Sequence, residues 1–198
     1  MNQLPLFLIR RLKRRVRRAI RKRGLRLAIE AGLQIGDRCN VSGDVYFGTR
    51  PYLVQIGNHV DISREVIFVT RDGDHSWMFK DNPERSDLKY YDTIEIKDHC
   101  FIGIRAIFLP GVTVGPYSIM GAGSVVARDV PPNAVVMGNP ARPVCTVDMY
   151  SQLVRYRFFH YAPGVRADWK RSREAIQRNL EILRSRRAAA VRTSRTDT

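Results

Sequence analysis

The sequence predicts an all-β solenoid, because apolar residues recur every six positions through the middle of the chain. The fifth position of each hexad is small or slim, and glycine occupies the second position in three hexads. A helical face repeats at about 3.6 residues and a plain strand at about 2, so a strict six predicts short strands separated by turns. Such units bury their apolar faces only by stacking, which predicts coils of parallel strands. The leading positions are Ile96, Ile102, Phe108, Val114, Met120 and Val126.

The period continues upstream, and its interruption is informative. Ile56, Ile62 and Phe68 hold the register, which is lost after Phe68 and resumes at Ile96. A repeat that keeps its register on both sides of an insertion has expelled a loop, here residues 70–93. The predicted organisation is therefore a helical extension at 1–34, a repeat domain at 35–147 and a second helical extension at 148–198.

Charge is distributed unevenly along the 198 residues. The net charge of +15 divides into +10 for residues 1–34, −3 for 35–149 and +8 for 150–198. Leu8, Leu12, Val16 and Ile20 fall at helical spacing among arginines, which predicts a basic amphipathic helix. Two interpretations remain open: residues 1–26 adsorb to an anionic membrane surface, or the helix packs on the solenoid. Nucleic acid is disfavoured as a partner, because no aromatic-rich platform accompanies the charge.

The C-terminal extension has the pattern of a capping helix, and the cysteines have no binding pattern. Trp169, Ile176, Leu180 and Leu183 line one helical face that could cap the last coil, and the tail beyond residue 187 has a disordered composition. Three cysteines without a CxxC pattern indicate neither a disulfide framework nor a metal site, and no secretory pattern is visible. We therefore expect a cytoplasmic protein, peripheral on the inner face of the plasma membrane if the first interpretation holds.

A resemblance can now be stated from the motifs FIG, PGVTVG, GAGSVV and GNPAR between residues 101 and 142. This string resembles the hexapeptide-repeat acyltransferases, close to the maltose, galactoside and polysaccharide O-acetyltransferases. The resemblance covers residues 36 to about 147. It implies a left-handed parallel β-helix, a homotrimer, acetyl coenzyme A as the acyl donor, a saccharide acceptor and no metal.

Acyl transfer to a hydroxyl needs a base, and a neutral imidazole suits that role near pH 7. Of the four histidines, His59 and His99 share one corner position of their hexads, which favours a structural role, and His160 lies outside the repeats. His75 lies in the expelled loop, within TRDGDHSW. We predict His75 as the catalytic base.

The neighbours of His75 depart from the pattern of the family. Relatives commonly read Thr-His-Asp-Gly at the start of this loop, whereas this chain has Arg71, whose guanidinium keeps its proton at neutral pH. Asp72 or Asp74 could hold the imidazole in one tautomer, and Trp77 could stack on a sugar face.

The resemblance also implies a donor site. Small residues would let backbone N–H and C=O groups approach the pantetheine amides, and arginines would meet the phosphates. Phe101 replaces a common Trp, and Cys145 stands where some sugar acetyltransferases carry a second arginine. The implied donor-binding positions are Gly103, Ile104, Gly121, Ala122, Ala127, Arg128 and Arg142.

The expected function is acetyl transfer from acetyl coenzyme A to a hydroxyl of a surface polysaccharide or glycan precursor. Three alternatives stay open at this point. One is an N-acyltransferase acting on an amino sugar or xenobiotic, and another is a non-catalytic solenoid scaffold at a membrane. The third is a zinc enzyme resembling the γ-type carbonic anhydrases, for which His59, His75 and His99 would have to converge on one ion.

Overall fold

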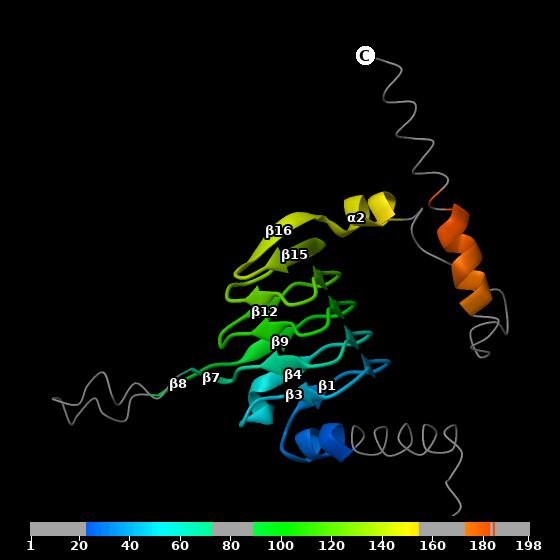
Figure 1. Cartoon of the computed structure of the whole chain (residues 1–198). Coiled ribbons are helices and arrows are strands. Elements are labelled where there is room, and N and C mark those ends of the chain that lie inside the picture. The colour runs from blue at the N-terminus through cyan, green and yellow to red at the C-terminus, as the bar shows by residue number, and fades with distance from the viewer. Residues whose placement is uncertain (1–22, 73–88, 155–172, 183, 185–198) are drawn as a thin grey trace, which may run out of the picture. The chain divides into compact units, whose positions relative to one another are not determined.

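The computed structural model describes residues 23–72, 89–154, 173–182 and 184. The chain forms two compact units, Met1–Tyr150 and Ser151–Thr198. In the first unit, successive short strands pass in turn to three sheets of mainly parallel strands, which form stacked coils (Figure 1). The predicted solenoid of parallel strands is therefore confirmed.

The three sheets contain four, six and four strands. One comprises β1 (Gln34–Ile35), β4 (Val54–Ile56), β9 (Ile94–Ile96) and β12 (Thr113–Val114). The second comprises β2 (Asn40–Val41), β5 (Asp61–Ile62), β10 (Phe101–Ile102), β13 (Ile119–Met120), β15 (Ala134–Gly138) and β16 (Ala141–Thr146). The third comprises β3 (Val45–Tyr46), β6 (Val66–Phe68), β11 (Ile107–Phe108) and β14 (Val125–Val126).

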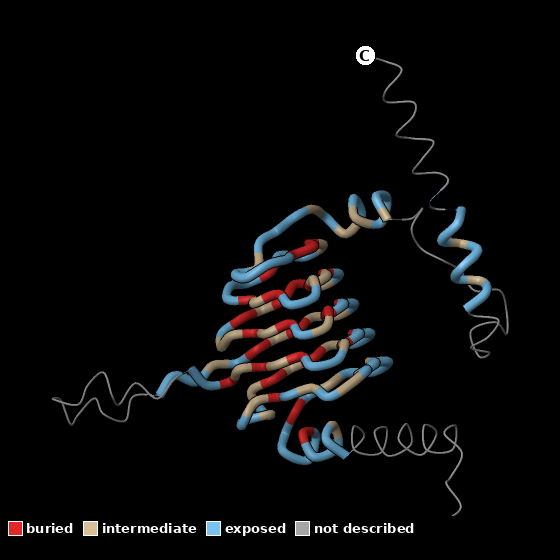
Figure 2. The backbone as a smooth tube through the Cα atoms, viewed as in Figure 1, coloured by how far each residue is buried: buried red, intermediate tan, exposed pale blue. Residues whose placement is uncertain are grey.

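The hexad register determines which side chains enter the core. Ile96 pairs with Val114, Ile102 with Met120 and Phe108 with Val126, so one coil takes three hexads. All six of these side chains are at most 1% exposed. Figure 2 shows buried positions recurring along each coil. The phenyl rings along the third sheet stack through three coils, with Phe68 lying between Phe47 and Phe108.

The slim fifth positions are buried beside turns, as predicted for Cys100. Its thiol donates to the carbonyl of Gly115 at 3.1 Å, and burial raises its pKa to about 11. The half-buried Cys39 makes the corresponding bond to Gly57 at 3.0 Å. These thiols stay protonated near neutral pH and bond one coil to the next, which agrees with a packing role.

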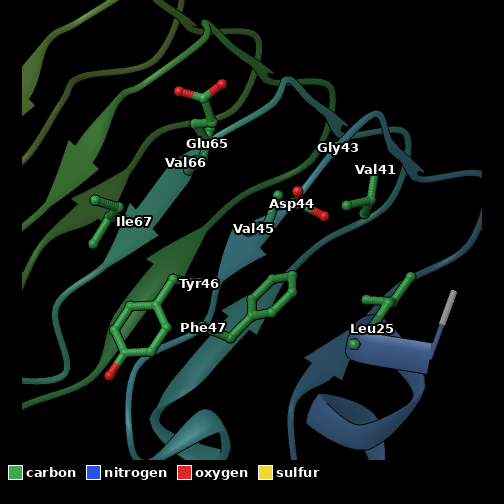
Figure 3. A pocket seen from close by; sticks show the side chains of 11 residues that line it. Leu25, Val41, Gly43, Asp44, Val45, Tyr46, Phe47, Glu65, Val66 and Ile67 are labelled. Atoms are coloured by element: carbon green, nitrogen blue, oxygen red, sulfur yellow. The ribbon is translucent and has the colours of Figure 1, made fainter. Parts of the chain in front are cut away.

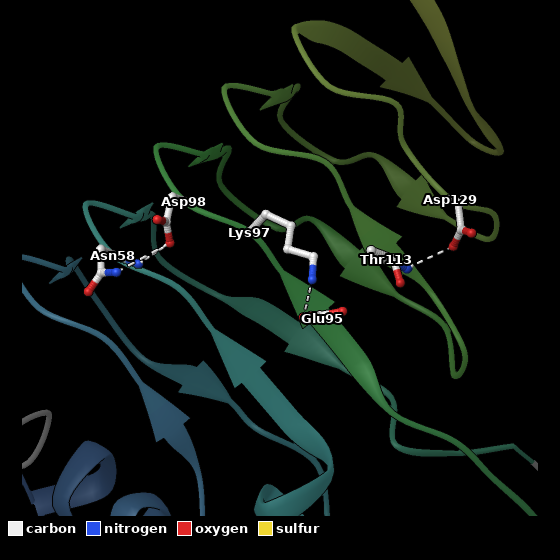
Figure 4. Close-up of polar contacts among 6 residues, drawn as sticks. All are labelled: Asn58, Glu95, Lys97, Asp98, Thr113 and Asp129. Atoms are coloured by element: carbon white, nitrogen blue, oxygen red, sulfur yellow. Dashed lines mark hydrogen bonds and ion pairs between the residues drawn. The ribbon is translucent and has the colours of Figure 1, made fainter.

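The predicted corner position of His59 and His99 has left-handed backbone geometry, with φ of 56° and 58°. Their rings stack with centroids 4.6 Å apart, and His99 stacks on Tyr117 at 4.7 Å. Beside them, Asn58 donates its backbone N–H to Asp98 at 2.7 Å, and this bond lowers the pKa of the Asp98 carboxyl (Figure 4). This corner is a ladder of stacked rings and hydrogen bonds between coils.

The ends of the chain are helical where the structure describes them. Residues 23–30 form a helix that places Ala28 in the core, and the short helix η1 (Pro51–Leu53) follows the first coil. Helix α2 (Val147–Val154) follows β16, and residues 173–182 are helical in the second unit. No helix among the described residues has the length and apolar content needed to cross a bilayer. Residues 1–22, Trp169, Leu183 and the tail from 185 lie outside the described part of the chain.

Candidate active site

The expelled loop leaves the solenoid through a short antiparallel stem. Its strands are β7 (Arg71–Asp72) and β8 (Tyr90–Tyr91), with Arg71 opposite Tyr91 and Asp72 opposite Tyr90. The coil continues across the insertion, because Ile56 pairs with Ile96 and Phe68 with Phe108. The side chains of Arg71 and Asp72 are exposed at this stem. His75, Asp74 and Trp77 lie outside the described residues.

A hydrogen-bonded pair lies where the stem leads into the next coil. The Tyr90 hydroxyl donates to Asp92 Oδ2 at 2.7 Å, and Asp92 Oδ1 accepts from the Thr93 N–H at 2.8 Å. The bond to Tyr90 lowers the pKa of Asp92, and the same bond raises the pKa of Tyr90. Gly111 has a φ of 83°, and a Cβ there would lie 2.9 Å from Asp92 Oδ2, so this corner favours glycine beside the pair. The sequence analysis did not predict the pair of Tyr90 and Asp92. The two residues are two positions apart just before the register resumes at Ile96, and this spacing was the available signal.

The predicted donor residues near residue 103 meet at one corner of adjacent coils. A Cβ at Gly103 would lie 2.6 Å from the backbone nitrogen of Ala122, so the two chain segments touch only because Gly103 lacks a side chain. The Gly123 N–H donates to the Ile104 carbonyl at 2.8 Å. Ile104 and Gly121 are half-buried, and Ala122 is exposed. Gly103 itself is buried. The exposed, small side chain of Ala122 leaves the surface beside this corner accessible, which suits an extended amide-containing ligand.

The two predicted arginines line one small cavity at the last coil. Arg128 and Arg142 are exposed and share a cavity of about 170 Å³ with Asp129, Val126, Ala141 and Pro143. Ala127, which precedes Arg128, is also exposed. The antiparallel pairing of β15 with β16 brings Arg142 back over this coil. The two guanidinium groups outnumber the single carboxylate of Asp129, which accepts from the Thr113 N–H, so the cavity carries net positive charge suited to phosphate.

A larger cavity lies at the opposite end of the solenoid. It has a volume of about 360 Å³ and lies between Leu25 and the first coils, with Phe47 and Val41 in its wall (Figure 3). Glu65 on its rim is paired with Arg105 at 2.6 Å. The lining is mainly apolar and includes no histidine, cysteine or lysine. Its size alone therefore does not make it the site of chemistry.

Other polar residues on the coils bond to one another and form no metal site among the described residues. Figure 4 shows the pair of Lys97 with Glu95 and the bond from the Thr113 N–H to Asp129, at 2.8 Å. No cluster of three metal-ligating side chains occurs among the described residues. His59 and His99 lie face to face with an interplanar angle of 10°, so their ring-nitrogen lone pairs lie in two nearly parallel planes. That geometry does not direct both imidazoles at one ion, as the zinc alternative requires.

Comparisons with known proteins agree with this architecture. Residues 93–128 match the family described as bacterial transferase hexapeptide (six repeats). CapG of Staphylococcus aureus is 46% identical over 121 residues, which are 60% of this chain and 69% of CapG. The galactoside O-acetyltransferase of Escherichia coli K12 is 38% identical over 92 residues, 46% of this chain and 43% of that enzyme. This chain thus spans less than half of the Escherichia coli enzyme.

A solved structure extends the likeness to three dimensions. A hexapeptide-repeat acetyltransferase from Vibrio cholerae, crystallised with acetyl coenzyme A, is 31% identical with a TM-score of 0.51. The match covers 58% of this chain and 60% of that protein. The chain belongs to the bacterial hexapeptide-repeat transferases. The prediction that it is an acyltransferase is confirmed by these relatives.

Proposed function

We propose that this chain is an acetyl-coenzyme-A-dependent O-acetyltransferase that modifies a hydroxyl group of a saccharide. The observation that carries the proposal is the donor edge, where Gly103 touches the backbone of Ala122 and where Arg128, just after β14, and Arg142, in β16, line one cavity. The named relatives support it, since one is a galactoside O-acetyltransferase and another was crystallised with acetyl coenzyme A. The left-handed winding of the coils is part of this proposal.

The proposed reaction divides the work between the loop and the coil edge. His75 takes the proton of the acceptor hydroxyl while the hydroxyl oxygen attacks the carbonyl carbon of the thioester. A backbone N–H stabilises the oxyanion of the tetrahedral intermediate, the C–S bond breaks, and the imidazolium returns the proton to the departing thiolate. Asp72, on the stem next to the loop, is available to orient the imidazole. No metal takes part in this scheme.

Release of free thiol from acetyl coenzyme A tests the function directly. The assay compares a galactoside, glucosamine and no acceptor, and the product is then treated with hydroxylamine, which cleaves an ester but leaves an amide intact. An ester product that depends on the galactoside supports O-acetylation. An amide product would favour N-acylation. If no thiol is released from acetyl coenzyme A with any acceptor, the non-catalytic scaffold is favoured.

Replacing both Arg128 and Arg142 by alanine is expected to raise KM for acetyl coenzyme A by roughly tenfold or more, with a smaller change in kcat. Each arginine offers charge-assisted hydrogen bonds to phosphate, and both side chains are exposed, so folding should be little affected. Arg50→Ala is a matched control, because Arg50 is exposed between β3 and β4, away from the last coil. A KM that rises equally in the control would contradict the assignment.

A trimer with donor sites shared between subunits is also proposed. The outer face of the third sheet carries an apolar row, in which Tyr46 pairs with Ile67, Ile67 with Ile107 and Ile107 with Val125. Tyr46 is 51% exposed, so the row is available to a second subunit. Light scattering should give about three times 22.7 kDa. A monomer that turns over acetyl coenzyme A at full rate would contradict the shared site.

A further inference from the structure

Three segments of the chain follow one another at a single corner of the solenoid, where β7 and β8 leave the coils (Figure 1). All three lead from the third sheet back to the first, on successive coils. They are residues 90–93 at the base of the stem, the turn at Gly111 and the turn at Arg128. Neighbouring coils are about 4.8 Å apart, so Gly111 lies one coil from the turn that we assign to the donor phosphates. The base of the stem is therefore close to the proposed donor site.

The base of the stem presents a polar face at this corner. Tyr90 and Asp92 are two positions apart, so their side chains lie on the same face, and Asp72 lies opposite Tyr90. Both side chains reach the next coil, because a Cβ at Gly111 would lie 3.1 Å from the Tyr90 hydroxyl and 2.9 Å from Asp92 Oδ2. Gly111 is exposed and places no side chain over these two oxygen atoms.

The pair has the hydrogen-bonding capacity that suits a hydroxyl-rich ligand. Tyr90 donates its one hydroxyl hydrogen to Asp92 at 2.7 Å, so its oxygen is left as an acceptor. The half-buried Asp92 carboxylate accepts that bond and one from the Thr93 N–H, and it has lone pairs for about two more. The bond from Tyr90 holds the pKa of Asp92 low, so the carboxylate is ionised near neutral pH. The Tyr90 side chain is 50% exposed and adds a ring on which the apolar face of a sugar can pack.

We propose that Tyr90 and Asp92 form a subsite that binds a hydroxyl group of the saccharide acceptor and thereby determines which acceptor is acetylated. The inference rests on the proposed acetyl transfer and adds acceptor contacts that the donor residues do not supply. Position supports it, because Gly103 precedes and Gly111 follows the same strand, β11, so the donor corner and the subsite lie at its two ends. Neither Tyr90 nor Asp92 exchanges a proton with the reacting atoms; the two side chains hold the acceptor.

Steady-state kinetics of the full chain with methyl β-galactoside and its monodeoxy analogues test the subsite. Among the analogues that are still acetylated, one should lose about tenfold or more in kcat/KM, because it lacks the hydroxyl that donates to Asp92. Asp92→Asn should raise KM for the galactoside by about tenfold or more and remove its advantage over that analogue, while KM for acetyl coenzyme A stays nearly unchanged. Tyr90→Phe, which keeps the ring, should raise KM for the galactoside in the same selective way, and it decides the question if Asp92→Asn does not fold.

The matched control is Asp98→Asn. Asp98 is also half-buried and accepts a backbone N–H, from Asn58 at 2.7 Å, but it lies between the first and second sheets. If Asp92→Asn keeps the full advantage of the galactoside over every analogue, the subsite is overturned while the acetyl transfer stands. Equal changes in Asp92→Asn and Asp98→Asn would also overturn it, because the loss of a bond between chain segments would explain both. If the unmodified chain forms no acetyl ester of the galactoside, the proposed function fails and the subsite fails with it.

Discussion

His75→Ala is expected to lower the rate of acetyl transfer by about 10²-fold or more while KM for acetyl coenzyme A stays nearly unchanged. The physical reason is that an alcohol is a poor nucleophile near neutral pH, so removal of the base leaves the transition state without a proton acceptor. The donor contacts proposed at Gly103, Arg128 and Arg142 are retained in this variant. Steady-state kinetics with a galactoside acceptor measure both quantities.

The matched control for His75 is His99→Ala. His99 is an exposed histidine of the same chain, but its ring lies between His59 and Tyr117, so its replacement should affect coil stacking and leave catalysis almost intact. Equal activity of His75→Ala and the parent protein would remove His75 from the mechanism. If His99→Ala loses acetyl-transfer activity and His75→Ala does not, His99 would be the base instead.

The repeat could be predicted from sequence because a six-residue period states which side chains face inward without knowledge of tertiary contacts. The predicted inward positions from Ile96 to Val126 are all buried. The corner geometry was less accessible. His59 and His99 adopt φ values that favour glycine, and their rings stack across coils, which a linear pattern does not contain. The assignment of both to a structural position nevertheless followed from their shared hexad position.

For the candidate site, the sequence predicted the arrangement of residues inside the hexad repeat but not that of residues outside it. Residues inside the repeat, such as Gly103 and Ala122, meet where the register places them. Arg128 and Arg142 share a cavity because β16 folds back antiparallel on β15, a turn that the hexad period does not describe. The pair of Tyr90 with Asp92 also lies outside the period. His75 remains a prediction from residue chemistry, because a loop expelled from the repeat is free of its constraint.

Phe108→Ala is expected to lower the free energy of unfolding by about 3–5 kcal/mol, through lost burial and a residual cavity. Phe108 is 0% exposed and stacks on Phe68 with ring centroids 5.1 Å apart, and Phe68 stacks on Phe47 at 5.5 Å. Flanking coils hold the backbone on both sides, so the space left by the ring cannot close freely. Urea unfolding at fixed protein concentration measures the loss as a shift of the midpoint.

Phe101→Ala is the matched control, since Phe101 is 44% exposed on the outer face of β10, in the same coil. Its loss should cost much less than that of Phe108. The comparison bears on function, because this coil carries Gly103 and pairs with the coil that begins the loop at Thr70. If the ring stack fixes the register across the insertion, Phe108→Ala should also raise KM for acetyl coenzyme A below the unfolding midpoint. Equal stability losses in the two variants would show that the stacked rings contribute nothing beyond general packing.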